Sequence, residues 1–182
     1  MILLGLGVAL WACSHLMKRV TPDLRRRLGD PAGKIVASLL SLAAIVLMVI
    51  GYRAAPFVAL WQPPAFLVHV NNLLMVIAVI LVNIGFSRGV MRGWMRHPML
   101  TSVMVWSVAH LLVNGDAASV LLFGGLGLWA VVDMALINRM EPARVAPPPG
   151  PVRNDLIYLA ASAAVFAAIA ALHTWLGYNP FG

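Results

Sequence analysis

Histidine is the residue type in this sequence with the clearest chemical potential. Five histidines interrupt a chain that is otherwise mostly apolar, and they are His15, His69, His97, His110 and His173. A neutral imidazole can bind a metal through one ring nitrogen while the other forms a hydrogen bond. Ionisable side chains within long apolar helices generally face other helices and mark functional sites. All five are therefore candidate ligands, and for His97 and His173 we keep the alternative of an interfacial hydrogen bond.

His69 and His110 form one candidate pair. Each lies about five residues inside the outer end of its predicted helix, so at a rise of about 1.5 Å per residue they share a depth. Two imidazoles facing each other across a helix bundle could ligate a haem iron from both sides. His15 lies about 12 Å deeper than His110 and is the other candidate partner. The alternative is that these histidines form hydrogen bonds that join helices.

Other polar residues accompany this pair in the predicted helices. Asn72 and Asn83 fall on the same face as His69, and we expect that face to contact other helices. Trp106 and Ser107 lie one turn before His110, on the same side. Asn72, Trp106 and Ser107 are therefore candidates for lining a cofactor.

Asp133 is the acidic residue that lies well inside a predicted helix. Buried acids generally find a basic partner, so we expect Asp133 to pair with an arginine of the third or fifth connection between helices. The functional alternative is a proton path or a substrate contact. No glycine-rich phosphate loop follows a strand, and the single cysteine, Cys13, provides neither a zinc cluster nor a disulfide.

The composition indicates a membrane protein. The chain has 182 residues, of which 62% are hydrophobic and 10% charged, and its mean hydropathy is +0.90. Soluble domains carry about 25% charged residues, so this chain lacks the polar surface that a water-soluble globule needs. Intrinsic disorder is excluded because it requires low hydrophobicity and high charge.

Apolar segments of the length that a bilayer requires recur along the chain. A membrane core of about 30 Å needs roughly 20 apolar residues in a helix. The sequence therefore predicts an all-α, polytopic membrane bundle of about six helices. Their expected ranges are Met1–Met17, Ile35–Gly51, Ala65–Phe86, Pro98–Val113, Ala117–Ile137 and Leu156–Leu176. We expect one transmembrane domain over residues 1–182, with a Pro-rich linker at residues 141–155.

The basic residues indicate an orientation. Twelve of the 13 Lys and Arg residues lie in the connections after the first, third and fifth helices, and only Arg53 lies on the other side. By the positive-inside rule those connections and the linker are cytoplasmic, which places both termini on the outer, periplasmic side. The net charge of +7 therefore reports topology rather than nucleic-acid binding. Anionic lipid headgroups are the expected partners of this charge.

Several short motifs, taken in order, resemble the bacterial NnrU proteins over about residues 3–139. They are Gly51-Tyr52-Arg53-Ala54-Ala55-Pro56, Leu60-Trp61-Gln62-Pro63-Pro64, Arg96-His97-Pro98-Met99-Leu100 and the run from Trp106 to Asp116. The resemblance implies a multi-pass protein of the bacterial inner membrane. It also implies a role in denitrification, in support of a nitrite or nitric oxide reductase system.

The same resemblance implies a cofactor. NnrU proteins are related to the plastid 15-cis-zeta-carotene isomerase, a membrane enzyme that holds haem b with two axial histidines. Its ligand motifs are similar to Ser14-His15 and to Trp106-Ser107-Val108-Ala109-His110. Carried over by motif, the ligands of the haem iron would be His110 and His15, with His69 retained from the depth argument.

Three other functions stay open at this point. The first is haem-dependent cis-trans isomerisation of a polyene, although Ser107 stands where the isomerase has a cysteine, and Leu16-Met17-Lys18 replaces a small, polar segment. The second is a haem-free scaffold for a reductase. The third is lipid methyltransfer, because Arg96-His97-Pro98 resembles a motif of isoprenylcysteine methyltransferases.

Overall fold

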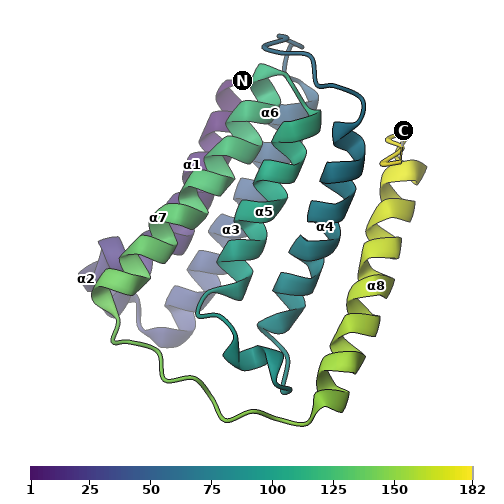
Figure 1. The fold of residues 1–182 in the computed structure, drawn as a ribbon. Coiled ribbons are helices and arrows are strands. Elements are labelled where there is room, and N and C mark those ends of the chain that lie inside the picture. Colours follow the sequence, from purple (N-terminus) through teal and green to yellow (C-terminus); the bar gives the residue numbers. More distant parts are fainter. Residues whose placement is uncertain (182) are drawn as a thin grey trace. The chain divides into compact units, whose positions relative to one another are not determined.

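The computed structural model describes residues 1–181 and is helical throughout, with no strand in that range (Figure 1). An isolated β-bridge joins Ala59 and Asp116. The elements are α1 (Ile2–Val20), α2 (Pro22–Leu28), α3 (Asp30–Arg53), α4 (Leu67–Ile84), η1 (Met91–Gly93), α5 (Pro98–Val113), α6 (Ala117–Ser119), η2 (Val120–Gly124), α7 (Gly125–Met140) and α8 (Val152–Trp175). This confirms the predicted all-α class.

Five helices within the described residues are long and apolar enough to cross a membrane. They are α1, α3, α4, the continuous helix Ala117–Met140 and α8. The continuous helix contains one π-helical turn, η2. The sixth expected segment, α5, is apolar but only 16 residues long. Five of the six segments expected from the composition are therefore helices that are long enough to cross a membrane.

Two helices begin earlier than their apolar segments. α3 begins at Asp30 rather than Ile35, and α8 begins at Val152 rather than Leu156. The expected linker at residues 141–155 is thus too long, because residues 152–155 form the first turn of α8. The physical reason is that hydropathy detects only the apolar part of a helix. Proline favours the first helical turn, where Pro31 lies in α3, and Pro151 is the N-cap residue of α8, so both helices start among polar residues.

The chain divides into two compact units. The first comprises Met1–Gln62 and Asn114–Met140, and the second comprises Pro63–Val113 and the chain from Glu141 onward. The first unit contains α1, α2, α3, α6, η2 and α7. Within it, α1 contacts both α3 and α7. In the second unit α4 contacts α5 and α8. The single domain expected over residues 1–182 stays a prediction.

Glycines allow α1 and α3 to approach closely in the first unit. A Cβ atom on Gly51 would lie 2.3 Å from the Leu4 nitrogen, and one on Gly7 would lie 2.8 Å from the Met48 nitrogen. Both glycines are buried. Small residues at such crossings let helix backbones touch, which is the main source of packing energy between helices in lipid.

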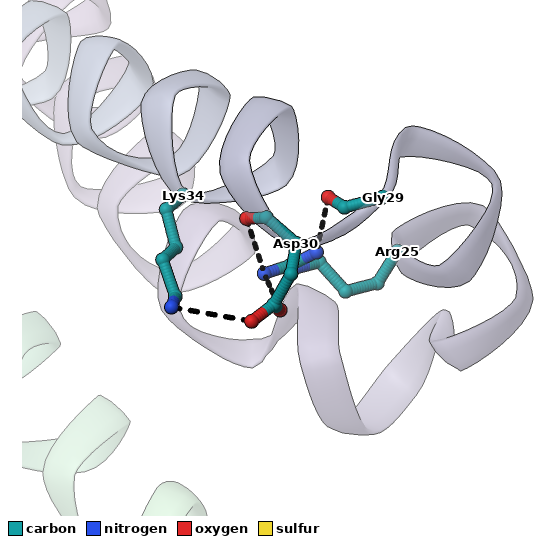
Figure 2. Close-up of polar contacts among 4 residues, drawn as sticks. All are labelled: Arg25, Gly29, Asp30 and Lys34. Carbon is teal, nitrogen blue, oxygen red and sulfur yellow. Dashed lines mark hydrogen bonds and ion pairs between the residues drawn. The ribbon is translucent and has the colours of Figure 1, made fainter.

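A polar cluster fixes the turn between α2 and α3 (Figure 2). The Arg25 guanidinium donates to the Gly29 carbonyl at 2.9 Å and to the Asp30 carboxylate at 3.0 Å. Lys34 forms a second ion pair with Asp30, at 3.2 Å. Gly29 has a φ of +72°, a conformation that favours glycine. The first basic connection is therefore a folded turn and not a loose loop.

Hydrogen bonds join the three helices of the second unit. The Ser102 hydroxyl on α5 donates to the Ala78 carbonyl on α4 at 2.7 Å. The Asn83 amide on α4 donates to the Ser162 hydroxyl on α8 at 2.8 Å. Such bonds between helices stabilise bundles in a medium that offers no water.

The buried carboxylate of Asp155 anchors the first turn of α8. It accepts hydrogen bonds from the Ser87 hydroxyl at 2.8 Å and the Val90 backbone N–H at 2.7 Å. Gly89 leaves the space for this carboxylate, since a Cβ there would lie 2.0 Å from Asp155 Oδ1. Asn154 also donates to the Arg88 carbonyl at 3.2 Å. The connection between α4 and α5 is thus tied to α8.

We expect Gly51→Ala to destabilise the protein by about 1–3 kcal/mol, because the added methyl forces α1 away from α3. The matched control is Gly93→Ala, where no atom lies within 4 Å of the added Cβ. Thermal unfolding in detergent, followed by tryptophan fluorescence, measures both. Equal midpoints for the two variants would contradict the close approach at Gly51.

Candidate functional site

His15 lies on α1 in an aromatic and polar environment within the first unit. Its Nδ1 atom is 2.9 Å from the Trp11 carbonyl oxygen, one turn earlier. A carbonyl oxygen can only accept, so this contact places the proton on Nδ1 and leaves the Nε2 lone pair available. The Ser14 hydroxyl lies 3.0 Å from the same Nδ1 and 3.1 Å from the Ser41 hydroxyl on α3.

His110 lies on α5 in the second unit and has the same local arrangement. Its Nδ1 atom is 3.0 Å from the Trp106 carbonyl oxygen. The two rings are in contact, with centroids 5.0 Å apart. Ser107 is buried beside them on the same helix.

These two sites share a sequence pattern that we call the Trp–His turn, defined by Trp11–His15 and Trp106–His110. In both, a tryptophan precedes a histidine by four residues, its carbonyl accepts from Nδ1, and its ring packs on the imidazole. Trp106 was expected at the site from the sequence, whereas Trp11 was not. The repeated Trp-x-x-x-His spacing is the signal that would have found it. In each Trp–His turn the carbonyl contact orients the imidazole and places its proton on Nδ1, as at many metal-binding histidines.

The remaining histidines lack this arrangement. His173 on α8 forms the same Nδ1 contact, at 2.8 Å, but with the carbonyl of Ile169. His69 is exposed near the start of α4. His97 precedes α5, and its carbonyl accepts from the Thr101 hydroxyl at 2.8 Å. His69 and His173 therefore lie on helices, as His15 and His110 do, whereas His97 precedes one.

The asparagines expected on the face of His69 have separate partners. The Asn72 side-chain oxygen accepts from the Asn71 amide at 3.0 Å. Asn83 donates to Ser162, as described above. His69 is exposed while Asn71 is buried, so the polar residues of α4 do not form one continuous buried face.

An ion pair lies one turn below His15 in the first unit. Arg19 Nη1 on α1 is 2.9 Å from Asp133 Oδ1 on α7, and both side chains are largely buried. The predicted partner for Asp133, an arginine of the third or fifth connection, was wrong. Because α1 and α7 lie side by side and run in the same direction, their polar ends come together (Figure 1). Arg19 was expected in the connection after the first helix, but α1 continues to Val20 and so includes it.

A third aromatic residue completes the surroundings of His15. The Trp129 ring on α7 meets the His15 ring edge-on, with centroids 4.9 Å apart, and meets Trp11 at 5.6 Å. Trp129 precedes Asp133 by four residues, so both side chains lie on the face of α7 that contacts α1. Sequence reasoning missed Trp129, because nothing along the chain links residues so far apart.

Several motif residues that carry the family resemblance have architectural roles in the first unit. The Tyr52 hydroxyl lies 2.8 Å from the Ser119 hydroxyl, and Ser119 in turn donates to the Asp116 carboxylate at 2.5 Å. Gly115 accepts through its carbonyl from the Leu60 backbone N–H at 2.7 Å. A Cβ on Gly115 would lie 2.0 Å from the Trp61 carbonyl oxygen. These contacts close the end of the unit opposite Arg19 and Asp133.

The Arg96-His97-Pro98 motif also has a structural role. Arg96 donates to the carbonyl of Pro142 at 2.9 Å. This contact holds the segment that follows Met140 against the start of α5. This structural role explains the presence of Arg96 without invoking a methyltransferase site.

Within the described chain, no group of three or more His, Cys, Asp or Glu side chains is arranged to hold a metal ion. A haem iron needs only two axial ligands, because the macrocycle supplies the other four. The imidazoles of the two Trp–His turns are nitrogen donors of the type that proteins use to ligate a haem iron.

Comparison with known proteins identifies one family. A family model described as NnrU protein matches residues 3–180. No curated protein and no solved structure matches the chain. The match extends beyond residue 139, where the resemblance in the sequence analysis ended, and so includes the linker and α8.

We expect Asp133→Ala to destabilise the protein by about 3 kcal/mol, because it removes the ionic partner of the largely buried Arg19. The double variant Arg19→Met/Asp133→Leu should recover most of this loss, since two apolar side chains replace the pair. Asp23→Ala is the control, because its pair with Arg26 is exposed. Unfolding midpoints in detergent measure all three. A double variant no more stable than Asp133→Ala would argue against coupling between Arg19 and Asp133.

Proposed function

The chain belongs to the NnrU family, and we propose that it is a multi-pass protein of the bacterial inner membrane that binds haem b. In this proposal it supports nitrite and nitric oxide reduction in denitrification through a redox, sensing or assembly role. The family assignment supports the biological setting, and the histidine geometry supports the cofactor.

The observation that carries the haem proposal is the pair of Trp–His turns. In each, a backbone carbonyl holds the Nδ1 proton of the imidazole, at 2.9 Å for His15 and 3.0 Å for His110. Haem and other metal sites use this arrangement to fix the tautomer and orient the ligating nitrogen. His110 is the first proposed ligand, His15 the second, and His69 is the alternative to His15.

The residues of the chain would then have distinct tasks. His110 and His15 would ligate the iron through Nε2, and Trp11 and Trp106 would hold the two rings in position. When bound, haem supplies one-electron redox chemistry. Two histidine ligands fill the coordination sphere, which favours electron transfer over the binding of a small ligand such as nitric oxide.

The proposed function includes the membrane orientation that the basic residues of the sequence indicate. Basic residues cluster at the end of the first unit where Arg19, Arg25 and Lys34 lie. We assign that end to the cytoplasm, where anionic lipid headgroups would contact it, and the two termini to the periplasm.

The scaffold alternative receives less support from the same contacts. At His15 and His110 the Nδ1 contacts described above are to carbonyls of their own helices, so they do not join helices. Haem-dependent polyene isomerisation would use the same ligands, so the cofactor test applies to it as well. Expression in cells that accumulate 15-cis-zeta-carotene separates isomerase from redox protein through the presence or absence of isomerised product.

We expect the purified protein to contain about one haem b per chain, with the sharp reduced α-band of a six-coordinate iron. His110→Ala and His15→Ala should each lose most of the haem or convert it to a high-spin form. Optical spectra before and after dithionite reduction, with a pyridine haemochrome assay, measure both changes. His173→Ala is the matched control, since His173 has the same Nδ1 contact without a tryptophan.

The outcomes separate the alternatives. Haem retained in His15→Ala but lost in His69→Ala would move the second ligand to His69. Unchanged haem in His110→Ala would remove the assignment of the first ligand. If the wild-type protein contains no haem after expression with ample haem precursor, the haem-free scaffold function is favoured.

A further inference from the structure

Two buried hydrogen-bond donors lie beside His15 without a partner. The indole Nε1 atoms of Trp11 and Trp129 are both inaccessible to solvent and have no acceptor among residues 1–181. The Trp129 side chain as a whole is also buried. Nearly all buried N–H groups in proteins are satisfied, so each exception calls for a specific explanation.

The two indoles and the imidazole form one compact group within the first unit. Trp11 stacks on His15 with ring centroids 4.1 Å apart, and Trp129 meets His15 edge-on at 4.9 Å. The two indoles are themselves in edge-to-face contact at 5.6 Å. The donors without partners therefore border the imidazole whose Nε2 is available for ligation.

The nearby acceptors of the first unit have other partners. The Asp133 carboxylate, one turn from Trp129, accepts from Arg19 at 2.9 Å. The Trp11 carbonyl oxygen already accepts from Nδ1 of His15 and from the Ser14 hydroxyl. Ser14 and Ser41 form hydrogen bonds with each other and with carbonyls of their own helices. An acceptor for the two indoles would therefore come from a bound molecule.

We propose that the indole N–H groups of Trp11 and Trp129 bind a peripheral carboxylate of the haem that His15 ligates. This inference rests on the proposed function and extends it by naming a second set of contacts to the cofactor. An indole N–H is a donor only, which suits a carboxylate oxygen, and its ring system tolerates apolar surroundings. The carboxylates are also the polar groups at the edge of a haem b.

Comparing haem b with its dimethyl ester tests whether the indole N–H groups bind a haem carboxylate. The ester keeps the iron and the ring but lacks the free carboxylates. Titrated into apoprotein, haem b should bind the wild type about tenfold more tightly than the ester, the effect of one hydrogen bond to a charged group. Trp11→Phe and Trp129→Phe keep an aromatic ring but remove the N–H, so each should reduce this preference. The double variant should abolish it. Trp175→Phe, at an exposed position on α8, is the control and should keep the preference.

A spectroscopic measurement on the wild type tests the contact without any substitution. In protein labelled with ¹⁵N at the indole nitrogens, the Trp11 and Trp129 N–H signals should move downfield when a diamagnetic zinc protoporphyrin binds. Zinc protoporphyrin dimethyl ester gives the ring-current shift alone, so the downfield shift in excess of the ester's value reports the hydrogen bond to a carboxylate. This measurement uses only the wild-type protein, so it tests the contact even if the phenylalanine variants fail to fold.

The results distinguish failure of this inference from failure of the proposed function. If haem b and its ester bind equally well, with or without the indole N–H groups, the inference is overturned while haem binding stands. If the indole signals already have hydrogen-bonded shifts without porphyrin, a water or a lipid oxygen is the partner, which also overturns it. If neither form of haem binds the wild type, the proposed function fails first and this inference fails with it.

Discussion

Polar groups that lie inside apolar helices must find partners within the protein, because lipid offers none. This constraint explains most of the specific contacts in the structure. Arg19 and Asp133 pair between α1 and α7, Ser102 donates to a carbonyl of α4, and Asp155 accepts from the connection between α4 and α5. Each contact joins elements that apolar packing alone would leave free to slide, because lipid tails are as apolar as the side chains that they meet.

The same constraint prepares the histidines for ligation. A histidine in a helix can satisfy Nδ1 with the carbonyl four residues earlier, and His15 and His110 both do so. The hydrogen bond that satisfies one ring nitrogen also places the proton on Nδ1 and so assigns metal ligation, in the proposed function, to Nε2. The tryptophan at the same position adds ring packing, so the imidazole is both satisfied and held in one orientation.

The motif residues divide between architecture and chemistry. Gly51, Gly115 and Asp116 are explained by close backbone approach and hydrogen bonding, and they require no ligand. Trp106 and His110 belong to a Trp–His turn and have the chemistry for a cofactor. A motif that identifies a family therefore does not by itself identify the residues that act. Here the contacts of each side chain make that distinction.

The sequence by itself determined the helical class, the apolar segments and the family, since hydropathy and motif order are local properties that add up along the chain. It also gave His110, His15 and His69, in that order, as candidate ligands of a haem iron, which stays a prediction. It did not reveal that Arg19 is the partner of Asp133, that Asp155 anchors α8, or that Trp129 meets Trp11 beside His15. Those contacts join residues 65 to more than 100 positions apart. Only the tertiary structure decided them, because the partner of a buried polar group depends on which helices pack together and in which direction.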